Sequence, residues 1–218
     1  MTQGAHWMDR VMHDLRGPLM PLQTAAYLLK HERGQLDAQR EQELIDIIQR
    51  QSQRMARMLV EFGDWTRAQQ QRLLRVSARC EIPAILDQAI GAVPGCAIDP
   101  VLDARCAVAC VNVDELRLVQ ALGTLVGYSH ARDATTTLHA GCANMQLTLL
   151  IRDRGVLLDP AQIDTLLDQP EAAPRDEGLG LGMMLARSIF DGHGGSVRAT
   201  SMADGLLIAC QLPLADEA

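Results

Sequence analysis

Near the start of the chain, a histidine is followed directly by an aspartate, and these two side chains could act together in a reaction. His13 and Asp14 lie in a run of helix-forming residues. A neutral imidazole carries a lone pair on one ring nitrogen, and a neighbouring carboxylate can accept a hydrogen bond from the other nitrogen and fix the tautomer. An exposed helical histidine with an acidic neighbour is also common without any function. The pair alone therefore leaves both interpretations open.

The residues around the pair predict how the imidazole is positioned. Apolar residues recur at alternating spacings of four and three, which is the heptad pattern of a helix packed lengthwise against other helices. The members are Met8, Met12, Leu15, Leu19, Leu22, Ala26 and Leu29. His13 comes one position after Met12, so we expect its ring to project from the helix surface. Pro18 has no N–H to donate to the Asp14 carbonyl, so we expect the helix to bend there.

A second heptad run predicts that this helix pairs with another one. Its members are Leu44, Ile48, Gln51, Met55, Met58, Phe62 and Trp65. We expect Gly34 to end the first helix and Asp37 to cap the second, which gives an antiparallel helical hairpin. Ile45, Ile47 and Leu59 widen the apolar stripe beyond what one partner helix can cover. Two hairpins are therefore predicted to associate into a four-helix bundle, as a homodimer.

The string His-Asp-Leu-Arg-Gly-Pro-Leu, which begins at His13, resembles the H-box of bacterial two-component sensor histidine kinases. The usual form of that box is His-Glu/Asp-Leu-Arg-x-Pro-Leu, and the resemblance covers roughly residues 6–70. It implies that His13 is the phosphoacceptor and Asp14 its acid/base neighbour, with Arg16 as the third member of the catalytic set. Gly17 stands where the family often has a Thr or Asn that positions a hydrolytic water.

Composition narrows the classes of partner and compartment. The 218 residues suffice for two small domains, and the net charge of −7, with a pI of about 5.3, argues against nucleic acid as the main partner. No apolar run is long enough to span a membrane, so we expect a cytoplasmic protein without a sensor segment of its own.

Six cysteines lack CxxC spacing and are expected to be reduced core thiols, with no metal site. They are Cys80, Cys96, Cys106, Cys110, Cys142 and Cys210.

The hydrophobic period changes after a Gln- and Arg-rich stretch at residues 67–79. We therefore expect a hairpin domain over 1–75 and a second domain over 76–218. In the second domain, helices are expected at 83–93, 114–130 and 181–191, and strands at 106–113, 135–140, 145–153, 196–201 and 206–212. The predicted fold class is α + α/β, in which the helical hairpin precedes an α/β sandwich with its helices on one face of the sheet.

Three glycines alternate with leucines at the start of the last predicted helix. Gly178, Gly180 and Gly182 would let backbone N–H groups converge on an anion, aided by the helix dipole. A glycine-rich turn before a helix is, however, more often only a turn. A dinucleotide fingerprint is excluded, because the preceding segment is expected to be a loop rather than a strand.

In this context the segment from about 112 to 214 resembles the ATPase domain that follows the hairpin in histidine kinases. Asp153-Arg154-Gly155 resembles the start of the family's Asp-x-Gly-x-Gly box, and the string that begins at Gly178 resembles its second glycine box. The resemblance implies ATP and Mg²⁺ as cofactors, with Asp153 on the adenine amino group. The implied nucleotide-binding glycines are Gly155, Gly178, Gly180 and Gly182.

Several residues depart from the ATPase pattern. Thr124 and Tyr128 stand where the family has asparagines, and the second of these is its Mg²⁺ ligand, for which a phenol is a poor substitute. Leu157 replaces a glycine of the first box, and Asp176 and Glu177 precede the second. Each of two carboxylates about 4 Å from a polyphosphate would disfavour its binding by roughly 1 kcal/mol in water and by about 4 kcal/mol at a protein surface. We therefore expect impaired use of ATP.

These features together predict a dimeric two-component signalling protein. It would carry phosphate on His13 and pass it to an aspartate of a response regulator receiver domain. Two alternatives stay open: a kinase-derived histidine phosphotransferase that does not use ATP, and a non-catalytic dimeric scaffold that binds response regulators.

Overall fold

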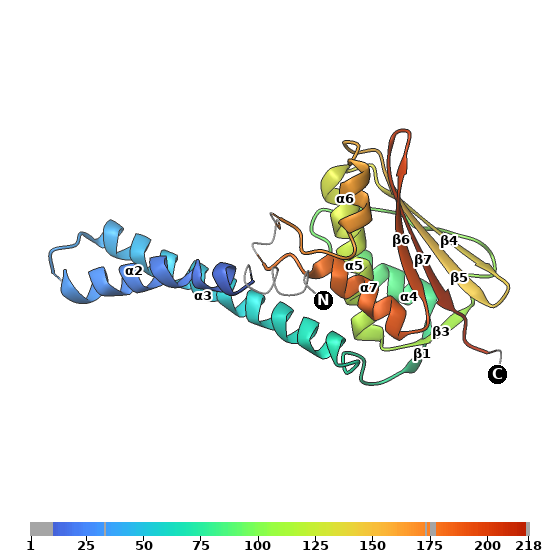
Figure 1. Cartoon of the computed structure of the whole chain (residues 1–218), viewed down its shortest axis with the longest axis horizontal. Helices are drawn as coiled ribbons and strands as arrows, with labels where there is room; N and C mark the ends of the chain where they lie inside the picture. The colour runs from blue at the N-terminus through green and yellow to red at the C-terminus, as the bar shows by residue number, and fades with distance from the viewer. Residues whose placement is uncertain (1–10, 33, 173, 175–177, 217–218) are drawn as a thin grey trace. The chain divides into compact units, whose positions relative to one another are not determined.

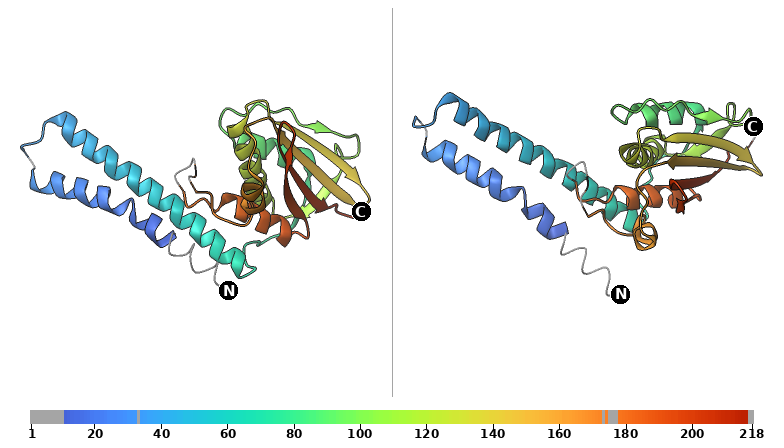
Figure 2. Two further views of the ribbon diagram at one scale, coloured as in Figure 1. Left: turned by 45° about the horizontal axis from the view of Figure 1, so that its top comes forward. Right: turned by 90° about the horizontal axis from the view of Figure 1, so that it is seen from above.

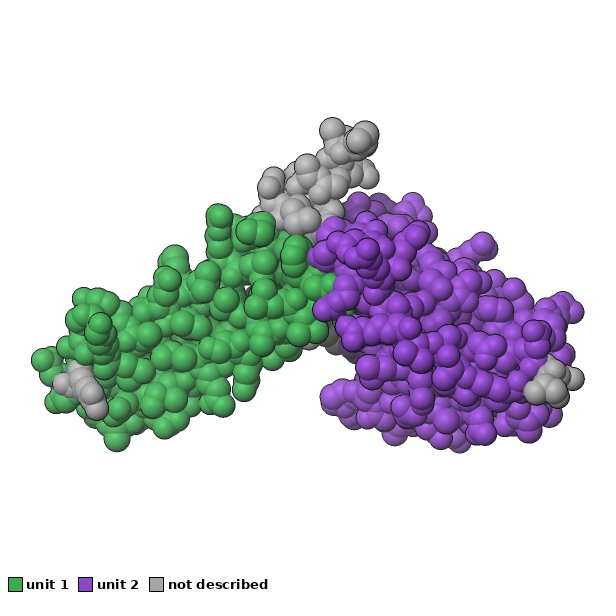
Figure 3. Space-filling view, turned by 90° about the horizontal axis from the view of Figure 1, so that it is seen from below, with its two compact units in different colours: residues 1–64, 171–181 green, residues 65–170, 182–218 purple. Residues whose placement is uncertain are grey.

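The structure, a computed structural model, describes residues 11–32, 34–172, 174 and 178–216. Met8, Asp176 and Glu177 lie outside these residues. The chain divides into two compact units, one of residues 1–64 with 171–181 and the other of residues 65–170 with 182–218 (Figure 3). The domain boundary expected near residue 75 stays a prediction.

The first unit is built on an antiparallel pair of helices (Figures 1 and 2). Helix α2 spans Leu19–His31 and helix α3 spans Ala38–Gln69. A helical segment over residues 11–16 precedes α2, and a turn at Gly17 and Pro18 separates the two. In this turn the Gly17 N–H donates to the Asp14 carbonyl at 3.2 Å. The chain is thus interrupted where Pro18 is expected to bend it, because proline cannot extend the helical hydrogen bonding.

The connection between α2 and α3 confirms the expected cap at Asp37, whereas Gly34 lies in the turn, two residues after the C-cap Glu32. Gly34 has a φ of +88°, a left-handed conformation that glycine adopts without steric cost. The Asp37 carboxylate accepts the N–H of Arg40 at 2.7 Å, which satisfies one of the unpaired amides at the start of α3. Asp37 thus marks the start of α3, and Gly34 lets the chain turn between the two helices.

The pair of helices buries only part of each apolar stripe. In the first helical stretch the buried residues are Val11, Pro18 and Ala25, one position before the predicted heptad members, and Met12 is 46% exposed. A single facing helix covers a narrower stripe than the three neighbours of a four-helix bundle would. Large apolar side chains that stay exposed on the pair are Met12, Met20, Tyr27, Ile45, Leu59 and Val60.

The second unit is an α/β sandwich in which α4, α5 and α7 cover one face of a sheet (Figure 1). The helices are α4 (Ile82–Gly91), α5 (Glu115–Arg132), α6 (Pro160–Thr165) and α7 (Gly182–Gly192). The strands are β1 (Ala78–Glu81), β2 (Val101–Leu102), β3 (Cys110–Val113), β4 (Thr137–Ala143), β5 (Gln146–Asp153), β6 (Ser196–Met202) and β7 (Gly205–Pro213). The five-stranded sheet has the order β2-β4-β5-β7-β6, with only β2 and β4 parallel, and β1 pairs separately with β3. The predicted fold class is confirmed.

Alternation along β5 places a carboxylate on the buried face of the sheet. Leu147, Leu149, Ile151 and Asp153 are the buried members of the strand, and the residues between them are more exposed. Because successive side chains of a strand point to opposite faces, Asp153 extends an otherwise apolar row. A buried carboxylate is costly unless a cation or hydrogen-bond donors compensate it.

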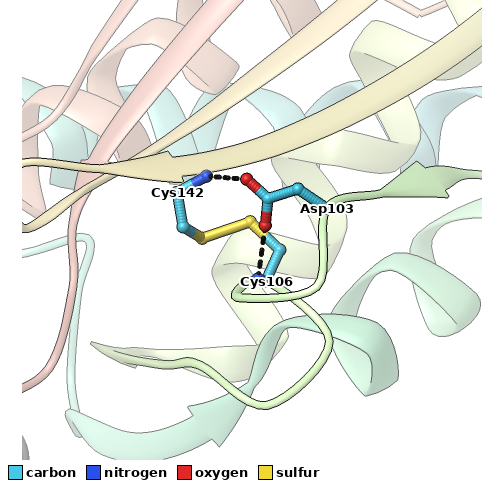
Figure 4. The surroundings of a disulfide bond; sticks show 3 residues. All are labelled: Asp103, Cys106 and Cys142. Atoms are coloured by element: carbon cyan, nitrogen blue, oxygen red, sulfur yellow. Dashed lines mark hydrogen bonds between the residues drawn. A yellow bond between two sulfur atoms is a disulfide. The ribbon is translucent and has the colours of Figure 1, made fainter.

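A disulfide joins Cys106 to Cys142 (Figure 4), which corrects the expectation that all six cysteines are reduced. Their Cα atoms lie 5.5 Å apart, as disulfide geometry requires. The Asp103 carboxylate accepts the N–H of Cys106 at 2.6 Å and that of Cys142 at 2.8 Å, which holds the turn after β2 against β4. Because this turn occupies residues 103–109, β3 begins at Cys110 and not at the predicted position 106.

Candidate functional site

His13 projects from the helical segment over residues 11–16, and its side chain is 87% exposed. Its Nδ1 atom lies 3.3 Å from Oδ1 of Asp14, so the expected pairing is present. A hydrogen bond to Nδ1 fixes the tautomer in which Nε2 keeps its lone pair. The turn at Gly17 and Pro18 follows within one helical turn. The imidazole is therefore accessible to a reacting group through Nε2.

A groove of about 680 Å³ lies beside His13 on the helical pair. The lining residues are His13, Arg16, Gly17, Met20, Pro21, Thr24, Ala25, Leu28, Arg40, Leu44 and Ile47. Most of these side chains are apolar, while Arg16 adds positive charge and the guanidinium of Arg40 is paired with Glu43 at 2.8 Å. A surface of this kind suits a protein partner with both apolar and acidic groups. The sequence singled out Arg16 but not the groove.

In the second unit, Arg132 neutralises the buried Asp153. The Arg132 Nε atom lies 3.0 Å from Asp153 Oδ2, and these side chains are 11% and 0% exposed. The other carboxylate oxygen accepts the N–H of Gly155 at 3.0 Å, and the Arg132 guanidinium also donates to the Val156 carbonyl at 2.5 Å. A Cβ at Gly155 would lie 2.9 Å from the Arg132 Cβ, so the absence of a side chain there allows the close approach. Both Asp153 oxygens are thus engaged within the chain.

The two residues at the asparagine positions are also engaged. The Thr124 hydroxyl donates to the Gln120 carbonyl in its own helix at 3.0 Å. The Arg132 guanidinium carbon lies 5.8 Å from the centre of the Tyr128 ring, a distance typical of a cation–π contact. The structure therefore places Tyr128 and Arg132 side by side and directs the Thr124 hydroxyl at the backbone of α5.

The glycine string is divided between the two units. Gly178 and Gly180 belong to the first unit, whereas Gly182 begins α7 in the second. Gly180 has a φ of +75°, and a Cβ there would lie 2.5 Å from the Glu171 carbonyl oxygen. In the first unit the amides of this loop contact the carboxylate of Glu61, a residue that the sequence did not single out.

Metal-ligand spacing occurs once among the described residues, in the cluster of Asp103, Cys106 and Cys142. The disulfide uses both sulfurs, and both carboxylate oxygens accept backbone N–H groups. These backbone donors, first that of Cys142 and then that of Cys106, lower the pKa of Asp103. As built, the cluster is a structural link between β2 and β4.

Comparison with known proteins finds a match for the segment that contains His13. The His Kinase A (phospho-acceptor) domain matches residues 6–71. Sensor protein ChvG of Rhizobium meliloti (strain 1021) is 23% identical over an alignment of 212 residues, and the match covers 88% of this chain and 36% of ChvG. Residues 6–71 are therefore similar to a phospho-acceptor domain, and the chain is similar to a sensor protein over most of its length. It spans about a third of the length of ChvG, the curated relative that it matches.

Two solved histidine kinase structures share the fold of the chain. ShkA, in complex with AMPPNP, superposes with a TM-score of 0.63 at 19% identity, covering 98% of this chain and 46% of ShkA. ThkA, in complex with the response regulator protein TrrA, superposes with a TM-score of 0.66 at 18% identity, covering 94% of this chain and 60% of that chain. The order of a helical region followed by an α/β domain is therefore that of histidine kinases.

The residues that sequence reasoning missed are the partners of the motif residues. Arg132 lies 21 positions before Asp153, and a buried carboxylate at the end of β5 is the one signal that calls for a nearby cation. No pattern in the sequence links Glu61 to the glycine loop, 118 positions later.

Among the described residues, no helix is both long and apolar enough to cross a membrane.

Proposed function

We propose that His13 takes up a phosphoryl group and exchanges it with the aspartate of a response regulator receiver domain. The observation that carries this proposal is the exposed imidazole with Nδ1 held toward Asp14. In the transfer, the Nε2 lone pair attacks phosphorus, a P–N bond forms and the P–O bond to the receiver aspartate breaks. The proton stays on Nδ1, where the Asp14 carboxylate stabilises the cationic ring.

Two findings support a receiver domain as the partner. The match to the phospho-acceptor domain covers the helical pair, and the related ThkA structure holds a response regulator. Arg16, three positions after His13 and exposed, offers a cation to such a partner. In our proposal Arg16 contacts the phosphoryl group or the acidic residues around the receiver aspartate.

We propose that the chain works as a homodimer through the helical pair. The apolar side chains left exposed there include Met20 at 74% and Val60 at 65%, more than a lone hairpin in water would favour. A second hairpin would cover them in a four-helix bundle. Light scattering should then give twice the chain mass of 23.8 kDa, and a mass of 23.8 kDa would contradict the dimer.

We also propose that the second unit does not use ATP. An adenine amino group would need to reach an Asp153 oxygen, but that side chain is 0% exposed and is held by Arg132 and by the Gly155 N–H. A magnesium ion would need oxygen ligands where the Thr124 hydroxyl bonds its own helix and Tyr128 lies beside a guanidinium. The residues present therefore do not fit ATP and Mg²⁺. Phosphate would reach His13 from a phosphorylated receiver domain, as in a kinase-derived histidine phosphotransferase.

Transfer from a receiver domain tests the phosphoacceptor. A receiver domain is phosphorylated with labelled acetyl phosphate, purified away from the donor, and mixed with the full chain. Label should move to the wild-type chain and to His31→Gln, which changes an exposed histidine of α2, but not to His13→Gln. If His13→Gln accepts as much label as the wild type, the proposal is wrong. A receiver domain that binds the chain without any transfer would favour the scaffold.

Incubation with labelled Mg·ATP tests the second unit separately. We expect no acid-labile label on the chain and no rise in its melting temperature. A ligand at a hundred times its dissociation constant would add about 2.7 kcal/mol of stability, which a thermal melt detects easily. Label on His13 from ATP would overturn the ATP-independent mechanism while retaining His13 as the phosphoacceptor.

A further inference from the structure

The carboxylate of Glu61, on α3, binds the backbone of the glycine loop within the first unit. Its Oε2 atom accepts the N–H of Leu179 at 2.6 Å, and its Oε1 atom accepts the N–H of Leu181 at 2.5 Å. Each oxygen thus has its own amide donor. Hydrogen bonds from amides to an ionised carboxylate are shorter and stronger than those between neutral groups.

The loop is shaped so that these two amides point at one place. Gly180, between them, has a φ of +75°, and alternation of backbone conformation around such a residue turns neighbouring N–H groups to the same side. The Gly180 carbonyl accepts the N–H of Glu171 at 2.9 Å, which closes the loop. The side chains of Leu179 and Leu181 are 2% and 0% exposed, so both amides are anchored.

We infer that Glu61 is a built-in anion that occupies the glycine loop and keeps external phosphate out of it. An anion that binds these amides must first displace the carboxylate, and it would meet the negative charge of Glu61 even after displacement. The same contact, which we call the latch, joins α3, the second helix of the pair that carries His13, to the loop that precedes α7. This inference does not depend on phosphate transfer to His13.

Amide hydrogen exchange in the full chain measures the latch directly. Exchange at Leu179 and Leu181 should rise by about tenfold or more in Glu61→Ala, because the hydrogen-bond acceptor is lost. Glu61→Gln keeps one neutral oxygen and should give a smaller rise. Glu41→Gln makes the same chemical change at an exposed position of α3 and should leave both amides unaffected. The Ile151 amide in the central sheet reports whether each variant stays folded.

Titration with inorganic pyrophosphate measures the blocking effect. In Glu61→Ala the amide resonances of Leu179 and Leu181 should shift at a concentration at least about tenfold lower than in the wild type. Unchanged exchange in Glu61→Ala, with Ile151 still protected, would overturn the latch. Equal responses of wild type and variant to pyrophosphate, or no response in either, would overturn the blocking role. Neither result bears on label transfer from a receiver domain to His13, so the two proposals fail separately.

Discussion

Opening the Cys106–Cys142 bond should weaken the second unit substantially. The bond ties the turn after β2 to β4, and both cysteines are buried, Cys106 at 0% and Cys142 at 8% exposure. The matched perturbations are reduction of the wild-type chain and the double substitution Cys106→Ser and Cys142→Ser. Both leave the hydrogen bonds from the two backbone amides to Asp103 available.

The size of the effect follows from the separation of the two cysteines. They lie 36 positions apart, so the bond removes the freedom of a loop of that length from the unfolded chain. In the chain-entropy description this corresponds to about 4 kcal/mol at 25 °C. For a unit of this size such a loss lowers the melting temperature by roughly 10–15 °C. The serine hydroxyls add a further cost if they lack partners in the core.

Thiol counting followed by urea unfolding tests this prediction. Under denaturing conditions without reductant, iodoacetamide should label four cysteines: Cys80, Cys96, Cys110 and Cys210. After reduction it should label six. Reductant should then lower the unfolding free energy of the wild type and leave that of the double serine variant unchanged. Six labels before reduction, or a change below about 1 kcal/mol on confirmed reduction, would refute the reasoning.

Three further perturbations probe other contacts. Arg132→Met leaves the buried Asp153 carboxylate without its cation, so urea unfolding should show that the free energy of unfolding falls by about 3–5 kcal/mol. The double variant Arg132→Met with Asp153→Asn should recover most of this loss. A loss below about 1 kcal/mol in the single variant would contradict the ion pair. Gly180→Ala forces a Cβ to 2.5 Å from a backbone oxygen of its own loop, so exchange of the loop amides should accelerate, and unchanged exchange would disprove the clash. Burial lowers the pKa of His193, whose Nε2 accepts the Asp114 N–H, so below about pH 6.5 the unfolded chain binds a proton that the folded chain does not. The unfolding free energy should therefore fall as the pH drops through that range, and His193→Gln should remove this part of the slope; an equal slope in both proteins would exclude His193 as its source.

Local patterns in the sequence predict the architecture well. The two heptad runs anticipate the helical pair, and Gly34 and Asp37 mark its turn as expected. Alternation along β5 and the glycines around α7 anticipate the sandwich. The short strands β1 and β2 and the helix α6 are not predicted, because four, two and six residues respectively carry too little periodicity to recognise.

Contacts between distant residues could not be predicted in the same way. Asp153, Gly155 and Gly180 resemble a nucleotide motif in the sequence, but their partners are set by the topology of the chain. Strand order brings β5 beside α5, so that Arg132 reaches Asp153. Hydrophobic periodicity describes which face of an element is buried and not which element covers it. The departures at Tyr128 and Thr124 therefore pointed to altered chemistry without showing what replaced the ligand contacts.

The position of phosphate on the chain tests the central claim most directly. After transfer from a phosphorylated receiver domain, phosphorus-31 and nitrogen-15 NMR of the full chain should show a phosphoramidate on Nε2 of His13. That nitrogen is expected because Asp14 holds Nδ1. His13→Gln should give no such signal. A phosphoramidate on another histidine, or on Nδ1 of His13, would contradict the account.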